Sequence, residues 1–165
     1  MIKKILIPLL FFVFTTSPLL AASTSSNDTV KKNIISSYKS AENRIKKAKK
    51  LEKKGKTDKA LKLYKKAFIF LKKANLEKPI DPNTLNYLGF TSRKLGNFED
   101  AEVYYLLGLS LDPDHNGINE YLGELYVVTK RIDLAKERLQ VLKSCDCEEY
   151  SELKEIIDGT KKSKY

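Results

Sequence analysis

Two cysteines form the clearest chemical pattern in this chain of 165 residues, which contains few reactive side chains. Cys145 and Cys147 are separated only by Asp146. Such a pair can form a structural disulfide if its Cα atoms lie within about 7 Å, or it can pack as two small apolar thiols. Redox chemistry or metal binding is a third alternative, although two cysteines need further ligands to complete a metal site. The residues alone leave all three alternatives open.

No other set of residues has the spacing of a catalytic site. The only histidine, His115, lies in a turn-like stretch of Asp, Pro, Asn and Gly, where we expect it to be exposed and without a catalytic role. The chain has no nucleophile motif around a histidine and no glycine-rich phosphate loop. We therefore predict no catalytic residue, no metal site and no cofactor, so the function must depend on binding surfaces.

The first 22 residues have the layout of a secretory signal peptide. Lys3 and Lys4 precede an apolar stretch over residues 5–14, and smaller residues follow up to Ala22. This order of a basic, an apolar and a small-residue zone is typical of a cleaved signal. We therefore expect an exported protein, either periplasmic or secreted. The alternative is an uncleaved anchor in which residues 5–22 hold the chain in the inner membrane.

Charge is divided unevenly along the chain. Residues 23–80 contain 18 Lys and Arg against 5 Asp and Glu, a formal charge of +13. Residues 81–160 contain 8 basic and 16 acidic residues, a formal charge of −8. A basic front on an acidic body suits an acidic protein or an anionic membrane surface, or it is simply a solvated helix face. Nucleic acid is the least favoured partner, because no nucleic-acid-binding motif is present.

An internal period of 34 residues runs through the acidic part. The residues that recur after 34 positions are Leu88, Gly89 and Ala101, which return as Leu122, Gly123 and Ala135. This spacing and these residue types resemble the tetratricopeptide repeat (TPR), a helix–turn–helix unit of 34 residues. The resemblance is strongest over residues 82–115, where Leu85, Tyr105 and Pro113 also match the family pattern.

The resemblance implies an all-α fold, a right-handed α-solenoid of about three helix–turn–helix repeats and a C-terminal capping helix. We expect a flexible leader at 23–32 and a helical domain at 33–159. Within that domain we expect repeats at 41–74, 82–115 and 116–149, a cap at 150–158, and a basic tail at 160–165. Because Ala60 and Ala101 are 41 residues apart, seven more than the period, the helix that starts at Thr57 should be two turns longer than usual.

The resemblance also implies a function: a non-enzymatic scaffold of the bacterial cell envelope that binds a peptide or a partner helix in its concave groove. The alternative is a protein that associates with anionic lipid or cell-wall polymer through its Lys-rich N-terminal helices. Glu120 and Glu124 stand where the relatives that clamp a peptide carboxylate have Asn or a cation. The family positions that contact ligands correspond here to Asn83, Asn86, Phe90, Arg93, Lys94, Glu120, Glu124 and Val127.

Overall fold

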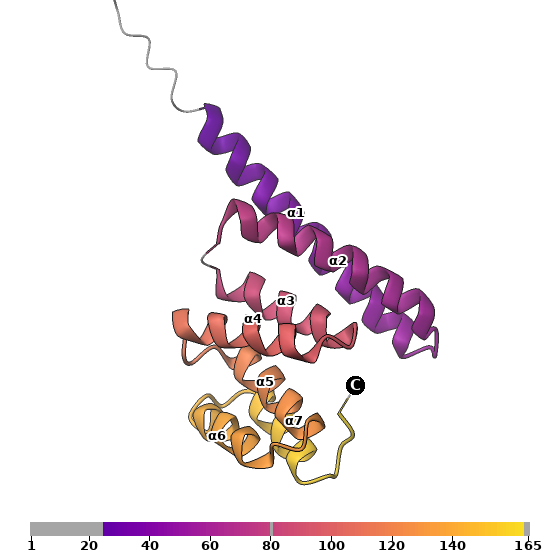
Figure 1. The fold of residues 1–165 in the computed structure, drawn as a ribbon, viewed down its shortest axis with the longest axis vertical. Coiled ribbons are helices and arrows are strands. Elements are labelled where there is room, and N and C mark those ends of the chain that lie inside the picture. The colour runs from indigo at the N-terminus through magenta and orange to yellow at the C-terminus, as the bar shows by residue number, and fades with distance from the viewer. Residues whose placement is uncertain (1–24, 80, 164–165) are drawn as a thin grey trace, which may run out of the picture.

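The computed structural model describes residues 25–79 and 81–163, with side chains from Ser37 onward. Helices joined by short turns make up this part of the chain (Figure 1). It contains no β-strand within those residues. The all-α prediction is therefore confirmed. The helices are α1 (Ser25–Glu52), α2 (Thr57–Glu77), α3 (Pro82–Lys94), α4 (Phe98–Leu111), α5 (Asn116–Val128), α6 (Ile132–Leu142) and α7 (Glu148–Ile157).

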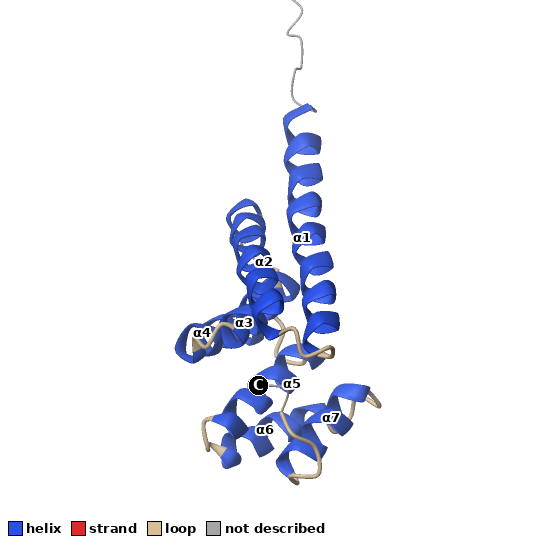
Figure 2. Cartoon of the chain, turned by 90° about the vertical axis from the view of Figure 1, so that its right-hand side faces the viewer, coloured by secondary structure: helices blue, strands red, loops and turns tan. Residues whose placement is uncertain are grey.

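The helices stack as consecutive pairs, α1 with α2, α3 with α4, and α5 with α6, and α7 then packs on α5 and α6. Figure 2 shows α2, α4 and α6 on one side of the stack, whereas α1 and α7 lie on the other. The first helices of the pairs therefore line one side of an α-solenoid, and the second helices form its opposite, outer side. A helix pair of this kind buries its apolar stripe only against its neighbours.

Small residues bring α1 and α2 close together. Ala41, Ala48, Ala60 and Ala67 are buried at helical spacing and contribute no bulk between the two backbones. Tyr64 and Leu71 fill the remaining space of this part of the core. α2 has 21 residues and α4 has 14. The difference corresponds to the two extra turns that the spacing of Ala60 and Ala101 predicts.

Local sequence signals set where α3 begins and ends. The Asp81 side chain accepts a hydrogen bond from the backbone N–H of Thr84 (3.1 Å), and Pro82 occupies the first helical position. The cap satisfies one of the free N–H groups of the helix start, and proline has no N–H that would need a partner there. Gly96 has a φ of +84°, a conformation that glycine adopts without steric cost, and the chain turns there into α4.

Gly89 and Gly123 occupy equivalent repeat positions but meet different neighbours. A Cβ atom on Gly89 would lie 2.4 Å from the ring of Tyr105 in α4, whereas one on Gly123 would lie 2.5 Å from Leu153 in α7. Leu139 takes the place of Tyr105 in the next repeat, and its side chain is shorter and half-buried. Each glycine thus leaves room for a large side chain, and at Gly123 that side chain comes from the last helix.

The boundaries differ from the sequence prediction at both ends. α1 begins at Ser25, so most of the leader that we expected to be flexible is helical. α7 begins at Glu148, two residues before the expected cap. The predicted signal peptide and the last two residues of the basic tail lie outside the described residues. No helix in the described part is long and apolar enough to cross a membrane.

Candidate ligand-binding cleft

A polar cleft of about 590 Å³ opens where α3, α5 and α7 begin. Its walls come from the first half of α3, from the turn between α4 and α5, from α5 and from the start of α7. These are first helices of successive pairs, so the cleft belongs to the inner side of the solenoid. The residues that line it are Asn83, Asn86, Tyr87, Asp112, Asp114, His115, Asn116, Gly117, Glu120, Tyr121 and Glu149.

The cleft is acidic. Four carboxylates line it, those of Asp112, Asp114, Glu120 and Glu149, and its described lining includes neither Lys nor Arg. Burial raises the pKa of the Tyr87 hydroxyl, and the Glu42 carboxylate adds to this shift, so the ring presents a neutral phenol. Carboxylates focused in a concave surface attract cationic groups and repel acidic ones. The chemistry of the lining therefore favours a basic ligand.

Asn86 adds an unsatisfied hydrogen-bond acceptor to the cleft wall. Its Oδ1 is buried and has no hydrogen-bond partner among the described residues. Gly117 faces its amide, since a Cβ atom there would lie 2.9 Å from the Nδ2 of Asn86. A buried acceptor without a donor is costly, so a ligand N–H that reached it would be favoured.

His115 fixes the edge of the cleft and is not an idle surface residue. Its Nδ1 accepts a hydrogen bond from the backbone N–H of Ile118 (3.2 Å) and so caps the start of α5. With Nδ1 as acceptor, the ring proton lies on Nε2, which is 3.3 Å from the Oδ1 of Asn83. The imidazole therefore ties α5 to the beginning of α3 across the two repeats.

Next to the cleft, an inner cluster fills the middle of the concave side. We define it as Lys49, Phe90, Arg93, Tyr121 and Glu124. The Lys49 ammonium lies 4.6 Å from the ring centre of Phe90 and 3.3 Å from the hydroxyl oxygen of Tyr121. Phe90 and Tyr121 are themselves in contact, with ring centres 5.3 Å apart. Contacts of this cluster thus join α1, α3 and α5.

An ion pair is buried in the inner cluster. The Nη2 of Arg93 lies 3.3 Å from the Oε2 of Glu124, and the two side chains are 0% and 2% exposed. Arg93 also donates through Nη1 to the carbonyl oxygen of Tyr121 (2.6 Å). The C-terminal tail closes over the pair, because the hydroxyl of Ser163 donates to the same Glu124 oxygen (3.1 Å).

Lys94 is held in a second ion pair at the side of the cluster. Its ammonium lies 2.9 Å from the Oε1 of Glu52, and the Tyr64 hydroxyl donates to the other oxygen of that carboxylate (2.8 Å). Burial lowers the pKa of Lys94, and the Glu52 carboxylate offsets part of this shift. Lys94 therefore links α3 to α1 inside the molecule.

The structure divides the predicted ligand contacts into two groups. Asn83, Asn86 and Glu120 line the cleft, as the repeat positions predict. Phe90, Arg93, Lys94 and Glu124 instead make contacts within the protein, and Phe90 is only 1% exposed. Val127 packs half-buried against the core between α5 and α6. Lys49 of α1 reaches Phe90 and Tyr121 with its long side chain and so links α1 to this inner part of α3 and α5.

Sequence reasoning missed several residues of the cleft. Asp112 and Asp114 belong to the inter-repeat turn, and Glu149 begins the last helix. The acidic run around Pro113 was visible in the sequence as a turn. The repeat pattern does not show that this turn, between α4 and α5, borders the cleft on the inner side of the solenoid.

Cys145 and Cys147 form a disulfide in the loop between α6 and α7, with Cα atoms 5.2 Å apart. Asp146 between them has a φ of +42°, and Cys147 is the residue that precedes the first turn of α7. Glu149 of the cleft follows two residues later. The bridge therefore restrains the loop that positions one of the cleft carboxylates.

Comparison with known proteins agrees with this architecture. Residues 83–115 match the tetratricopeptide repeat family. The matched segment spans nearly all of α3 and α4 with the turn that borders the cleft, so the TPR unit supplies one wall of the candidate site.

The chain is similar in fold to one solved TPR domain and gives lower scores with two others. The second TPR domain of human RPAP3, in complex with the HSP70 peptide SGPTIEEVD, has a TM-score of 0.51 at 15% identity, covering 76% of this chain and 98% of that one. The first TPR of Spaghetti (RPAP3), bound to the HSP90 peptide SRMEEVD, has a TM-score of 0.49 at 21% identity over 74% and 94%. The Arabidopsis OM64 TPR domain has a TM-score of 0.49 at 12% identity, covering 76% of this chain and 99% of that one. No curated protein matches the chain in sequence.

Proposed function

We propose that this protein is a non-enzymatic interaction scaffold that binds a basic peptide or the basic face of a partner helix in the concave cleft. The observation that carries the proposal is the acidic cleft of about 590 Å³ on the inner side of the TPR unit. TPR solenoids are modules for protein interactions, and repeat folds of this kind use their concave surfaces for binding. The scaffold role assigns no bond-making step to any residue.

The charge of the cleft predicts a ligand unlike the peptide in the complex of the human RPAP3 domain. The peptide SGPTIEEVD in complex with the RPAP3 domain is acidic. Here the four carboxylates that line the cleft would repel such a ligand. A Lys- or Arg-containing segment meets complementary charge there, and its backbone N–H groups face the amide of Asn86. We therefore assign the opposite ligand charge to this chain.

A pair of peptides tests the assignment. The probes are a labelled nonapeptide of Lys, Ser and Leu and the same peptide with Glu replacing every Lys. We expect the Lys peptide to bind in fluorescence anisotropy and the Glu peptide not to bind. Replacing Asp114→Asn together with Glu149→Gln should weaken binding of the Lys peptide about tenfold, because two charge contacts are lost.

The matched control removes the same two charges elsewhere. Asp133→Asn with Glu137→Gln changes two exposed residues of α6 that do not line the cleft. This variant should bind like the parent protein. Equal affinity for the Lys and Glu peptides, or an equal loss in both variants, would show that the cleft does not select a basic ligand.

We further propose that the scaffold works in the cell envelope. The support is the basic, apolar and small-residue order of residues 1–22, which is the layout of an export signal. Fractionation of the producing cells, with sequencing of the mature N-terminus, tests this location. A chain that stays in the cytosol with its first residues intact would contradict it, without bearing on the ligand of the cleft.

A further inference from the structure

Aliphatic side chains point into solvent from α4, on the opposite side of the solenoid from the cleft. Val103, Leu106, Leu107 and Leu111 are between 44% and 55% exposed and recur at steps of three and four residues. A helix that packs on a core through one side normally has polar residues on the other. α4 instead is apolar on both sides, so its outer side needs an explanation other than folding.

The neighbouring outer helix combines aliphatic residues with lysines. Along one side of α2, residues Lys62, Lys65, Ile69, Lys73 and Leu76 follow one another at helical spacing, and all are exposed. Ile69 is 58% and Leu76 is 82% exposed. This side is opposite the buried stripe of α2, which consists of Ala60, Tyr64, Ala67, Leu71 and Ala74.

The two exposed sides belong to one surface. Phe68 of α2 contacts Tyr104 of α4, with ring centres 6.3 Å apart, so the helices are neighbours. Figure 2 shows both on the same side of the stack, away from α1. We call this surface the outer lysine–leucine face and define it by Lys62, Lys65, Ile69, Lys73 and Leu76 of α2 and Val103, Leu106, Leu107 and Leu111 of α4.

We propose that the outer lysine–leucine face docks onto an anionic lipid bilayer. Lysines beside exposed aliphatic residues suit a bilayer surface of this kind. The ammonium groups would meet the anionic headgroups, and the aliphatic side chains would enter the apolar region just beneath them. The formal charge of +13 over residues 23–80 adds attraction of the same sign. A second copy of the chain fits less well, since its lysines would face those of the first.

The docking proposal does not depend on which ligand the cleft binds. Docking would, however, fix the direction in which the cleft faces. A protein that lies on a bilayer through α2 and α4 presents its concave side, and therefore the acidic cleft, away from the lipid. The headgroups and the cleft have the same sign of charge, so a basic partner would be attracted to both.

A single tryptophan reports on the contact. The natural chain has no Trp, so Leu107→Trp places the only indole on the proposed face. The comparison variant is Ser151→Trp, at an exposed position of α7. With vesicles of equal parts phosphatidylglycerol and phosphatidylcholine carrying brominated acyl chains, we expect strong quenching at position 107 and little at 151. Phosphatidylcholine vesicles alone should quench neither, and added salt should weaken the quenching at 107.

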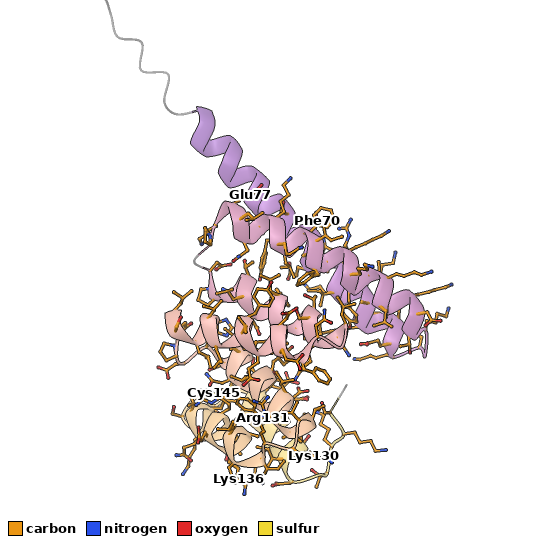
Figure 3. All side chains as sticks on the ribbon, viewed as in Figure 1. Phe70, Glu77, Lys130, Arg131, Lys136 and Cys145 are labelled. Atoms are coloured by element: carbon orange, nitrogen blue, oxygen red, sulfur yellow. A yellow bond between two sulfur atoms is a disulfide. The ribbon has the colours of Figure 1, made fainter. Side chains whose placement is uncertain are left out.

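Lysine variants test whether binding depends on the lysines of the outer lysine–leucine face or only on the net charge of the protein. Lys62→Gln with Lys65→Gln, in the Leu107→Trp background, should raise the lipid concentration for half-maximal quenching about 25-fold, about fivefold for each lysine. Lys136→Gln with Lys143→Gln removes the same charge near the other end of the molecule, where Figure 3 shows Lys136, and should leave the value unchanged.

Several results would overturn the docking proposal. Equal quenching at positions 107 and 151, or no quenching at 107, would show that this face does not meet the bilayer. Equal losses in the two lysine variants would show that only net charge matters. A dimer in analytical ultracentrifugation that Leu106→Ser with Leu107→Ser abolishes, together with no quenching at 107, would assign the face to a second copy of the chain. Each reading depends on position 107 and not on whether residues 1–22 are retained.

Discussion

Replacing Glu124 by Leu should lower the free energy of unfolding by about 3–5 kcal/mol, which is a large share of the stability of a small domain. The guanidinium of Arg93 is fully buried, and in the variant it would lose the carboxylate of Glu124 as a charge partner. The hydrogen bond from Arg93 to the carbonyl oxygen of Tyr121 (2.6 Å) brings no negative charge to replace it. Urea unfolding followed by circular dichroism at 222 nm measures the loss.

The double variant Arg93→Met with Glu124→Leu distinguishes a buried charge from a simple packing defect. If the uncompensated charge is the cause, removing both partners should restore much of the stability that either single variant loses, because similar volume then fills an apolar site. The exposed pair Lys154–Asp158 is the control, and Asp158→Ala should leave the urea midpoint unchanged. A Glu124→Leu protein as stable as the parent would show that water reaches Arg93.

The buried pair also shows what repeat positions alone do not predict, namely the contacts that a side chain makes inside the protein. Period and residue type predict the helices well: α2 is two turns longer than α4, as the 41-residue spacing requires, and Asp81 and Pro82 begin α3. These are local or periodic signals. The burial of Phe90 depends instead on the side chains that other helices place against it, such as Lys49 of α1 and Tyr121 of α5.

Several contacts on this inner side join residues that are far apart in the sequence. Lys49 reaches Tyr121, which lies 72 positions later, and Ser163 reaches Glu124, 39 positions away. No periodicity encodes either contact. The exposed cleft residues were predictable where they sit on the repeat pattern, as Asn83 and Asn86 do, and not where they come from the turn or from α7, as Asp114 and Glu149 do.

Shortening Leu153 to Ala should release the C-terminal end of the solenoid while the N-terminal end stays folded. Leu153 is fully buried and fills the space left by Gly123, so its removal opens a cavity between α5 and α7. Substitutions of this type cost about 2–5 kcal/mol. In a solenoid that cost falls on the repeat concerned, because each repeat contacts only its neighbours.

Hydrogen–deuterium exchange resolves where the Leu153→Ala protein opens. We expect amides of α5, α6 and α7 to lose protection and those of α1 and α2 to keep it. Ser151→Ala, an exposed neighbour on α7, should change neither. Since α7 carries Glu149, the same variant should weaken the Lys peptide in the anisotropy assay. Uniform loss of protection from α1 to α7 would contradict independent repeats, and it would mean that the inner cluster, through Lys49 and Tyr121, couples the two ends into one cooperative unit.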